Sequence, residues 1–178
     1  IMNLFEQIYE KAKLNPQKVV FPESLNEKML QAAYETGKDG YIMPILVGNP
    51  EEIKALIAAK GYEESVFQIV DMEDEAYKEE LIAKYVALPN AQLKEKALNR
   101  RMKDALQFAM VMQAVDEADV TFAGIEYTTG DVLRGGLMII GLKPGISTIS
   151  SIGICDIPGY EGSEGSLLAI GDSAVCTN

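Results

Sequence analysis

The chain has 178 residues, 48% of them hydrophobic and 24% charged, with a formal net charge of −11 and no histidine. This composition is typical of a globular protein with one substantial core, and no apolar run approaches the ~20 residues that span a bilayer. The excess of acids argues against general nucleic-acid binding. The lack of histidine excludes Ser-His-Asp triads and histidine metal ligands from this chain.

Two cysteines, Cys155 and Cys176, are too few for a disulfide framework. The first residues of the chain show neither a basic region nor an apolar signal core. We therefore expect a cytoplasmic protein with no metal site, no membrane partner and no nucleic-acid partner.

Helix and strand patterns alternate from the N-terminus. Leu4–Leu14 predicts an amphipathic helix, and residues 18–21 predict a strand that ends at Pro22. The spacing of Ser24 and Glu27 fits a capping box at the start of the next helix.

A second strand and helix follow. Residues 41–47 predict a strand, and the run Asn49-Pro50-Glu51-Glu52 predicts a helix start, with an N-cap, a proline and first-turn acids. Residues 65–70 predict a short strand, and residues 73–87 predict a charged helix.

One long helix is predicted over residues 91–115. Its apolar residues fall at helical spacing and are expected to lie in the core: Leu98, Met102, Ala105, Ala109 and Met112. Helices that alternate with strands imply right-handed crossovers. We therefore predict an α/β fold with a largely parallel sheet flanked by helices.

The pattern changes after Gly145. Residues 146–154 and 166–170 predict two strands of an antiparallel hairpin with a glycine-rich loop. We predict one domain over residues 1–145 and the first strands of a second, incomplete domain over residues 146–178. Cys155 is expected to be a buried structural thiol.

A candidate anion site lies at a predicted strand-to-helix junction. An apolar strand at residues 120–123 leads into a helix that opens at Thr128–Thr129 and carries Arg134 one turn inside. Helix N-termini favour anions, and an arginine adds a forked donor for phosphate. Thr128 and Asp131 also fit a plain capping box, so spacing alone leaves both interpretations open.

The segment GIEYTTGDVLRGGLMIIGLKPG, at residues 124–145, resembles the signature of the phosphate acetyltransferase and phosphate butyryltransferase family. Three further segments resemble that family in the same order: VVFPES at residues 19–24, YIMPILVG at residues 41–48 and AIGDSAV at residues 169–175. The resemblance covers nearly the whole chain. Family members are commonly near twice this length, so the resemblance implies roughly an N-terminal half of a two-domain architecture like that of isocitrate and isopropylmalate dehydrogenases.

Several positions depart from the family pattern. Lys28 and Tyr127 stand where an arginine and a histidine are common, and Gly135 and Cys176 replace a proline and an asparagine. Residues 85–90 replace a basic segment. These changes leave the acyl group open, and they indicate a divergent branch.

The resemblance implies an acyltransferase that moves an acetyl, butyryl or branched acyl group between acyl phosphate and coenzyme A. It implies CoA as a substrate, no covalently bound cofactor and a homodimer. The alternatives are a regulatory domain that binds acyl-CoA or acyl phosphate without turnover, and a dimerisation half with no ligand.

The resemblance also suggests site residues. Thr128, Thr129 and Arg134 would form the phosphoryl pocket, with Arg134 catalytic and Asp131 orienting it. Ser150, Ser151 and Lys28 are further candidates for phosphate or CoA binding. The thiol base is expected outside this chain, so this part alone need not be active.

Overall fold

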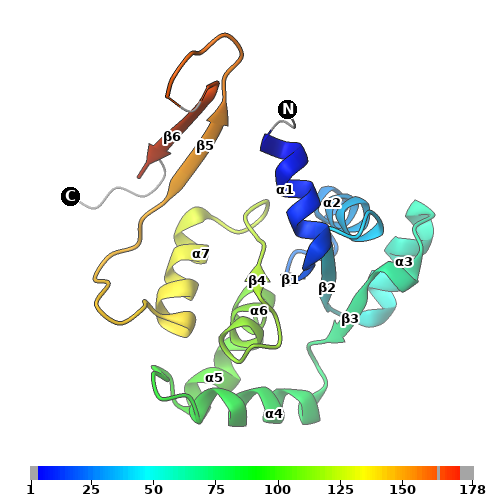
Figure 1. Ribbon diagram of the computed structural model, residues 1–178. Coiled ribbons are helices and arrows are strands. Elements are labelled where there is room, and N and C mark those ends of the chain that lie inside the picture. Colours follow the sequence, from blue (N-terminus) through cyan, green and yellow to red (C-terminus); the bar gives the residue numbers. More distant parts are fainter. Residues whose placement is uncertain (1–3, 164, 173–178) are drawn as a thin grey trace. The chain divides into compact units, whose positions relative to one another are not determined.

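The computed structural model describes residues 4–163 and 165–172 (Figure 1). The chain divides into two compact units, Glu6–Gly141 and the segment from Leu142 onward together with the first residues. The domain boundary expected after residue 145 stays a prediction. Cys176 and the last three residues of the AIGDSAV segment, 173–175, lie outside the described residues.

The unit Glu6–Gly141 is built on a four-stranded parallel sheet with the strand order β3-β2-β1-β4. Its strands are β1 (Gln17–Phe21), β2 (Ile42–Gly48), β3 (Gln68–Asp71) and β4 (Val120–Thr121). In this register Val20 lies opposite both Ile45 and Thr121. The predicted α/β fold with a parallel sheet is confirmed.

Helices precede, connect and follow the strands, and those between two strands of the sheet form crossovers. They are α1 (Leu4–Leu14), α2 (Glu27–Lys38), α3 (Pro50–Lys60), α4 (Glu75–Val86), α5 (Glu95–Arg101), α6 (Ala105–Ala114) and α7 (Thr129–Gly135), with a 3-10 turn at Glu64–Val66 and a π-helical turn at Gly136–Ile140. The predicted bounds of α1 and the predicted start of α3 are confirmed. Asn49 caps α3, because its side chain accepts hydrogen bonds from the backbone N–H groups of Glu51 and Glu52.

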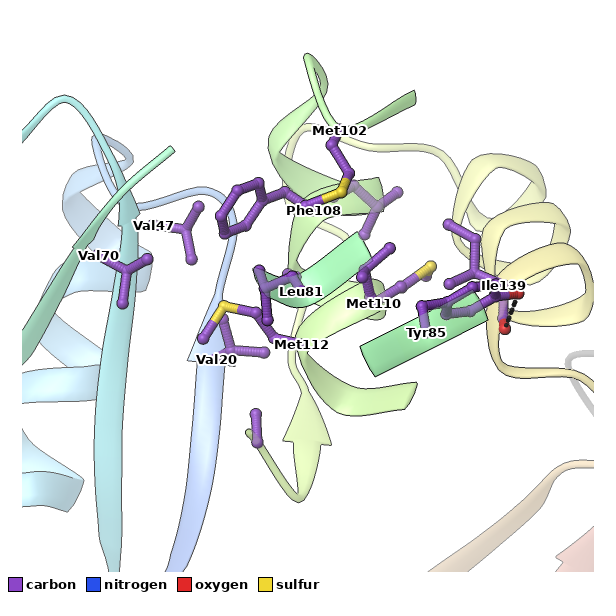
Figure 2. Close-up of a cluster of buried hydrophobic side chains, with 14 of the residues drawn as sticks. Val20, Val47, Val70, Leu81, Tyr85, Met102, Phe108, Met110, Met112 and Ile139 are labelled. Atoms are coloured by element: carbon purple, nitrogen blue, oxygen red, sulfur yellow. Dashed lines mark hydrogen bonds between the residues drawn. The ribbon is translucent and has the colours of Figure 1, made fainter. Parts of the chain in front are cut away.

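The sheet separates two hydrophobic clusters. Val19 and Phe21 point to the face covered by α2 and α3, whereas Val20 between them points to the face covered by α4, α5 and α6. On that second face Tyr85 is fully buried, and its hydroxyl donates a 2.8 Å hydrogen bond to the carbonyl of Ile139 in the π-helical turn (Figure 2). The turn that follows α7 is thereby tied to the core.

The long helix predicted over residues 91–115 is wrong, because the chain breaks between α5 and α6. Asp104 caps α6, and its side chain accepts a hydrogen bond from the backbone N–H of Gln107 at 3.0 Å. Met102 and Met112 are buried as predicted. Both short helices contribute to the same cluster, so the apolar spacing continues across the break.

Other local predictions also needed correction. The N-cap of α2 is Asn26, not Ser24. The Ser24 hydroxyl instead lies 2.7 Å from the Phe21 carbonyl and accepts a hydrogen bond from the Val47 N–H, so it links β1 to β2. The strands predicted at residues 65–70 and 120–123 are shorter than expected, at Gln68–Asp71 and Val120–Thr121.

The second unit contains an antiparallel hairpin of β5 (Ile152–Asp156) and β6 (Leu167–Gly171). The hairpin was predicted, but its first strand begins later than expected. Cys155 is exposed, so the prediction of a buried thiol is wrong. The reason is that none of the described residues from Leu142 onward is buried.

Across the described residues, none of the helices has the length and apolar character that crossing a membrane requires.

Candidate functional site

The carboxyl ends of the neighbouring strands β1 and β4 meet around one buried carboxylate. Glu23 follows β1 and is 4% exposed. Its two oxygens accept hydrogen bonds from four successive backbone N–H groups in the loop after β4: Gly124 at 3.0 Å, Ile125 at 3.2 Å, Glu126 at 2.6 Å and Tyr127 at 2.8 Å. Successive N–H groups that converge in this way form an anion-binding concavity.

This environment sets the charge of Glu23. Burial acts to raise the pKa of its carboxyl group, but the backbone donors from Tyr127, Glu126, Ile125 and Gly124 outweigh burial, and the pKa lies below the ordinary value of 4.5. Glu23 is therefore a carboxylate at neutral pH. Because it fills the four loop amides, those amides do not face an external anion.

In the sequence, Glu23 stands out only as part of the predicted strand and turn at residues 19–24. The available signal is an acid two residues after a strand, at the edge where ligands of parallel sheets usually bind.

Thr128 and Asp131 form a capping box at the start of α7. The Thr128 hydroxyl accepts from the Asp131 N–H at 3.2 Å and donates to the Asp131 carboxylate at 2.6 Å, which in turn accepts from the Thr128 N–H. The hydrogen bond from the Thr128 side chain is the main cause that lowers the pKa of Asp131. The hydroxyl of Thr128 and the carboxylate of Asp131 are thus engaged with each other.

Arg134 lies at the other end of α7 beside a cavity of about 320 Å³. The cavity is lined by Arg101, Asp104, Leu106, Gln107, Tyr127, Asp131, Arg134 and Gly135. Arg134 makes no hydrogen bond or ion pair with any residue that the structure describes. Its guanidinium is therefore available to a ligand.

Tyr127 is fixed at the cavity wall. Its hydroxyl donates to the Asp104 carboxylate at 3.0 Å and accepts from the Leu106 N–H at 3.4 Å. Burial, followed by the charge of Asp104, raises the pKa of Tyr127 to about 12. Tyr127 is therefore a neutral phenol at physiological pH and cannot serve as a base there.

The remaining candidates lie elsewhere. Thr129 is exposed in the first turn of α7, and Lys28 is exposed on α2 and does not line the cavity. Ser150 and Ser151 belong to the second unit, where the Ser151 N–H donates to Asp172 at 3.0 Å. In the part of the chain that the structure describes, no group of cysteines and carboxylates is arranged to hold a metal ion.

A protein-family model described as phosphate acetyl/butaryl transferase matches residues 3–178. The phosphate acetyltransferase of Thermoanaerobacterium thermosaccharolyticum is 30% identical over 175 residues, which cover 98% of this chain and 53% of that protein. The phosphate acetyltransferase of Clostridium acetobutylicum is 30% identical over 179 residues, covering 99% of this chain and 54% of that protein. The chain thus spans about half the length of these curated relatives.

Solved structures agree in fold. The EutD phosphotransacetylase from Staphylococcus aureus matches with a TM-score of 0.80 at 24% identity, over 96% of this chain and 50% of that one. A phosphotransacetylase from Streptococcus pyogenes matches with a TM-score of 0.76 at 26% identity, over 86% of this chain and 47% of that one. Since the family model matches nearly every residue of the chain, the chain belongs to the phosphate acetyl/butaryl transferase family.

Proposed function

We propose that this chain supplies the phosphoryl-binding part of an acyltransferase that moves an acyl group between acyl phosphate and coenzyme A. The observation that carries this proposal is Arg134, whose guanidinium makes no hydrogen bond or ion pair with the described residues and lines a cavity beside α7. Family membership supplies the reaction class.

The reaction makes a clear demand on this site. A CoA thiolate attacks the acyl carbonyl carbon, a thioester bond forms, and phosphate leaves with the electrons of the carbon–oxygen bond. A guanidinium beside the leaving group would neutralise its growing charge. Arg134 would do this through paired N–H groups. Thr129, at the start of α7, stays a candidate for phosphate binding, but it does not line the cavity.

Thr128 and Asp131 would act indirectly. Their mutual hydrogen bonds hold the first turn of α7 in place. Arg134 lies in the next turn of the same helix. Lys28, Ser150 and Ser151 stay candidates for phosphate or CoA binding. The thiol base is proposed to lie outside this chain, because Tyr127 is held as a neutral phenol.

A regulatory domain that binds acyl phosphate or acyl-CoA without turnover is the second candidate. One observation favours it. Tyr85 begins the segment that replaces the basic stretch of relatives, and it is buried with its hydroxyl on the Ile139 carbonyl. At that position the side chain packs in the core and is not exposed to contact a ligand.

The test is thioester formation from CoA with acetyl, butyryl and isobutyryl phosphate as donors, catalysed by the protein. Arg134→Ala should lower kcat/KM by about a hundredfold or more, since removal of one charge-stabilising donor costs that much in comparable sites. Arg100→Ala is the matched control: Arg100 is exposed on α5 and does not line the cavity.

The outcomes separate the candidates. Turnover that is lost in Arg134→Ala and kept in Arg100→Ala supports the acyltransferase, and the best donor identifies the acyl group. Binding of CoA or acyl phosphate without turnover by any donor favours the regulatory domain. Turnover that is unaffected by Arg134→Ala would refute the proposed role of this arginine.

A further inference from the structure

Arg101, the last residue of α5, lines the same cavity as Arg134. Its Nη1 donates to the side-chain oxygen of Gln107 at 2.9 Å, and its Nη2 lies 3.9 Å from the sulfur of Met138. Its Nε is buried and has no hydrogen-bond partner. A thioether is a weak acceptor, so much of the donor capacity of this guanidinium is unused.

The charge of Arg101 is also unpaired. No carboxylate lies within ion-pair distance of Arg101 or Arg134 in the described part of the chain. A partly buried guanidinium without a counter-ion is costly, because buried charges are normally paired and fully hydrogen-bonded. An anionic ligand would remove that cost.

Two carboxylates at the cavity wall accept hydrogen bonds from neighbouring groups. Asp104 accepts one hydrogen bond from the Gln107 N–H at the start of α6 and another from the Tyr127 hydroxyl. Asp131 accepts from the N–H and the hydroxyl of Thr128 through one oxygen, Oδ2. Among the described residues, neither carboxylate forms an ion pair with the two arginines, which are the cationic donors at this cavity.

We propose that Arg101 is a second guanidinium for the phosphoryl group, so that the cavity binds a phosphate-type anion between Arg101 and Arg134. This inference rests on the proposed function, because it assigns a further binding residue to the same site. A phosphoryl group offers three acceptor oxygens, which suits two forked donors better than a single carboxylate would.

The experiment is calorimetric titration of the 178-residue chain with inorganic phosphate, at an ionic strength held constant with chloride so that general screening is equal. The variants are Arg101→Ala, Arg101→Lys and Arg134→Ala, with Arg100→Ala as the control that removes the same charge from the adjacent position. Circular dichroism checks that each variant is folded.

We expect Arg101→Ala to weaken phosphate binding by about ten- to a hundredfold, as loss of charge-assisted hydrogen bonds does. Arg100→Ala should stay within about twofold of the wild type, since exposed charges contribute little. If Arg101→Ala fails to fold, Arg101→Lys decides, because it keeps the charge and loses the fork. Weaker binding by folded Arg101→Lys would then support the inference.

Phosphate binding by Arg101→Ala or Arg101→Lys that equals binding by Arg100→Ala would overturn the inference. If Arg134→Ala still weakens binding in that case, the proposed phosphoryl site stands without Arg101. If Arg134→Ala binds phosphate like the wild type, or if the wild type binds none, both the proposed site and the role of Arg101 fail.

Discussion

Single side chains shape the loop that leads into α7. Glu23 collects four backbone N–H groups of that loop and is itself buried. The carboxylate accepts hydrogen bonds from the loop amides, as a bound phosphate does in a phosphate-binding loop. Without the carboxylate, these converging N–H groups would lack an acceptor. The carboxylate therefore fixes the shape of this loop, and the loop amides are not open to an external anion.

Glu23→Gln should destabilise the fold. Each carboxylate oxygen accepts from two backbone N–H groups, so replacing one oxygen with an NH₂ group leaves two buried donors facing a donor. We expect a loss of about 3 kcal/mol in the free energy of unfolding at pH 7, measured by urea denaturation. Glu79→Gln is the control, because Glu79 is exposed and has no hydrogen bond or ion pair with the described residues.

The effect should depend on pH with a definite sign. The pKa of Glu23 is lower in the folded protein than its ordinary value of 4.5. Its stabilisation is therefore complete above that value and is lost as the pH falls through the folded pKa. The stability difference between the wild type and Glu23→Gln should be constant at neutral pH and shrink in acid. A difference that grows as the pH falls would contradict this assignment.

Among the elements, the π-helical turn Gly136–Ile140 depends most clearly on a distant partner. It continues directly from α7, and its Ile139 carbonyl accepts the hydrogen bond of the buried Tyr85 hydroxyl on α4. Carbonyl groups near the end of a helix lack intrahelical partners. The tyrosine therefore anchors the turn that directly follows α7, the helix that contains Arg134.

Tyr85→Phe should lower the free energy of unfolding by about 1–3 kcal/mol, because the buried Ile139 carbonyl loses its donor. Thermal and urea denaturation measure this loss. Tyr62→Phe is the matched control: the ring of Tyr62 stacks on Tyr34 at 4.1 Å, and its hydroxyl has no hydrogen bond with the described residues. Equal stability of the Tyr85→Phe variant and the control would show that the hydroxyl is not the anchor.

At the scale of the whole molecule, the two units differ in how much they bury. The unit Glu6–Gly141 holds both hydrophobic clusters, whereas the described residues of the hairpin unit are exposed or half-buried, with Ile152 at 71% exposure. A two-stranded hairpin with no packed face is marginally stable in water.

The rate of amide hydrogen exchange should therefore differ between the two units of the 178-residue chain. Amides of β1 and β2 should exchange only through global unfolding, whereas those of β5 and β6 should exchange much faster, through local opening. Mass spectrometry of peptides from Gln17–Phe21 and Leu167–Gly171, with a fully unfolded sample as the reference, measures this. Equal protection of the two peptides would contradict the expected difference.

The elements that sequence predicted well depend on neighbours in the chain. Asn49 as an N-cap and the capping box of Thr128 and Asp131 are signals contained within one helical turn. The break between α5 and α6 was missed because Met102 and Ala105 continue the apolar spacing of a single helix. Asp104 carried the cap signal, but periodicity outweighed it.

By itself, the sequence determined the alternation of helices and strands, the parallel α/β class, the resemblance to phosphate acyltransferases and the choice of Arg134 as a candidate site residue. These follow from periodicity, capping and motif order, which depend on residues close together in the chain. Only the tertiary structure decided that Glu23 fills the loop amides more than a hundred positions away, that Arg101 shares a cavity with Arg134, and that Cys155 is exposed. Those contacts depend on which strands pair and on which faces are covered by other elements. Local sequence patterns contain no information on either, because both involve residues far apart in the chain.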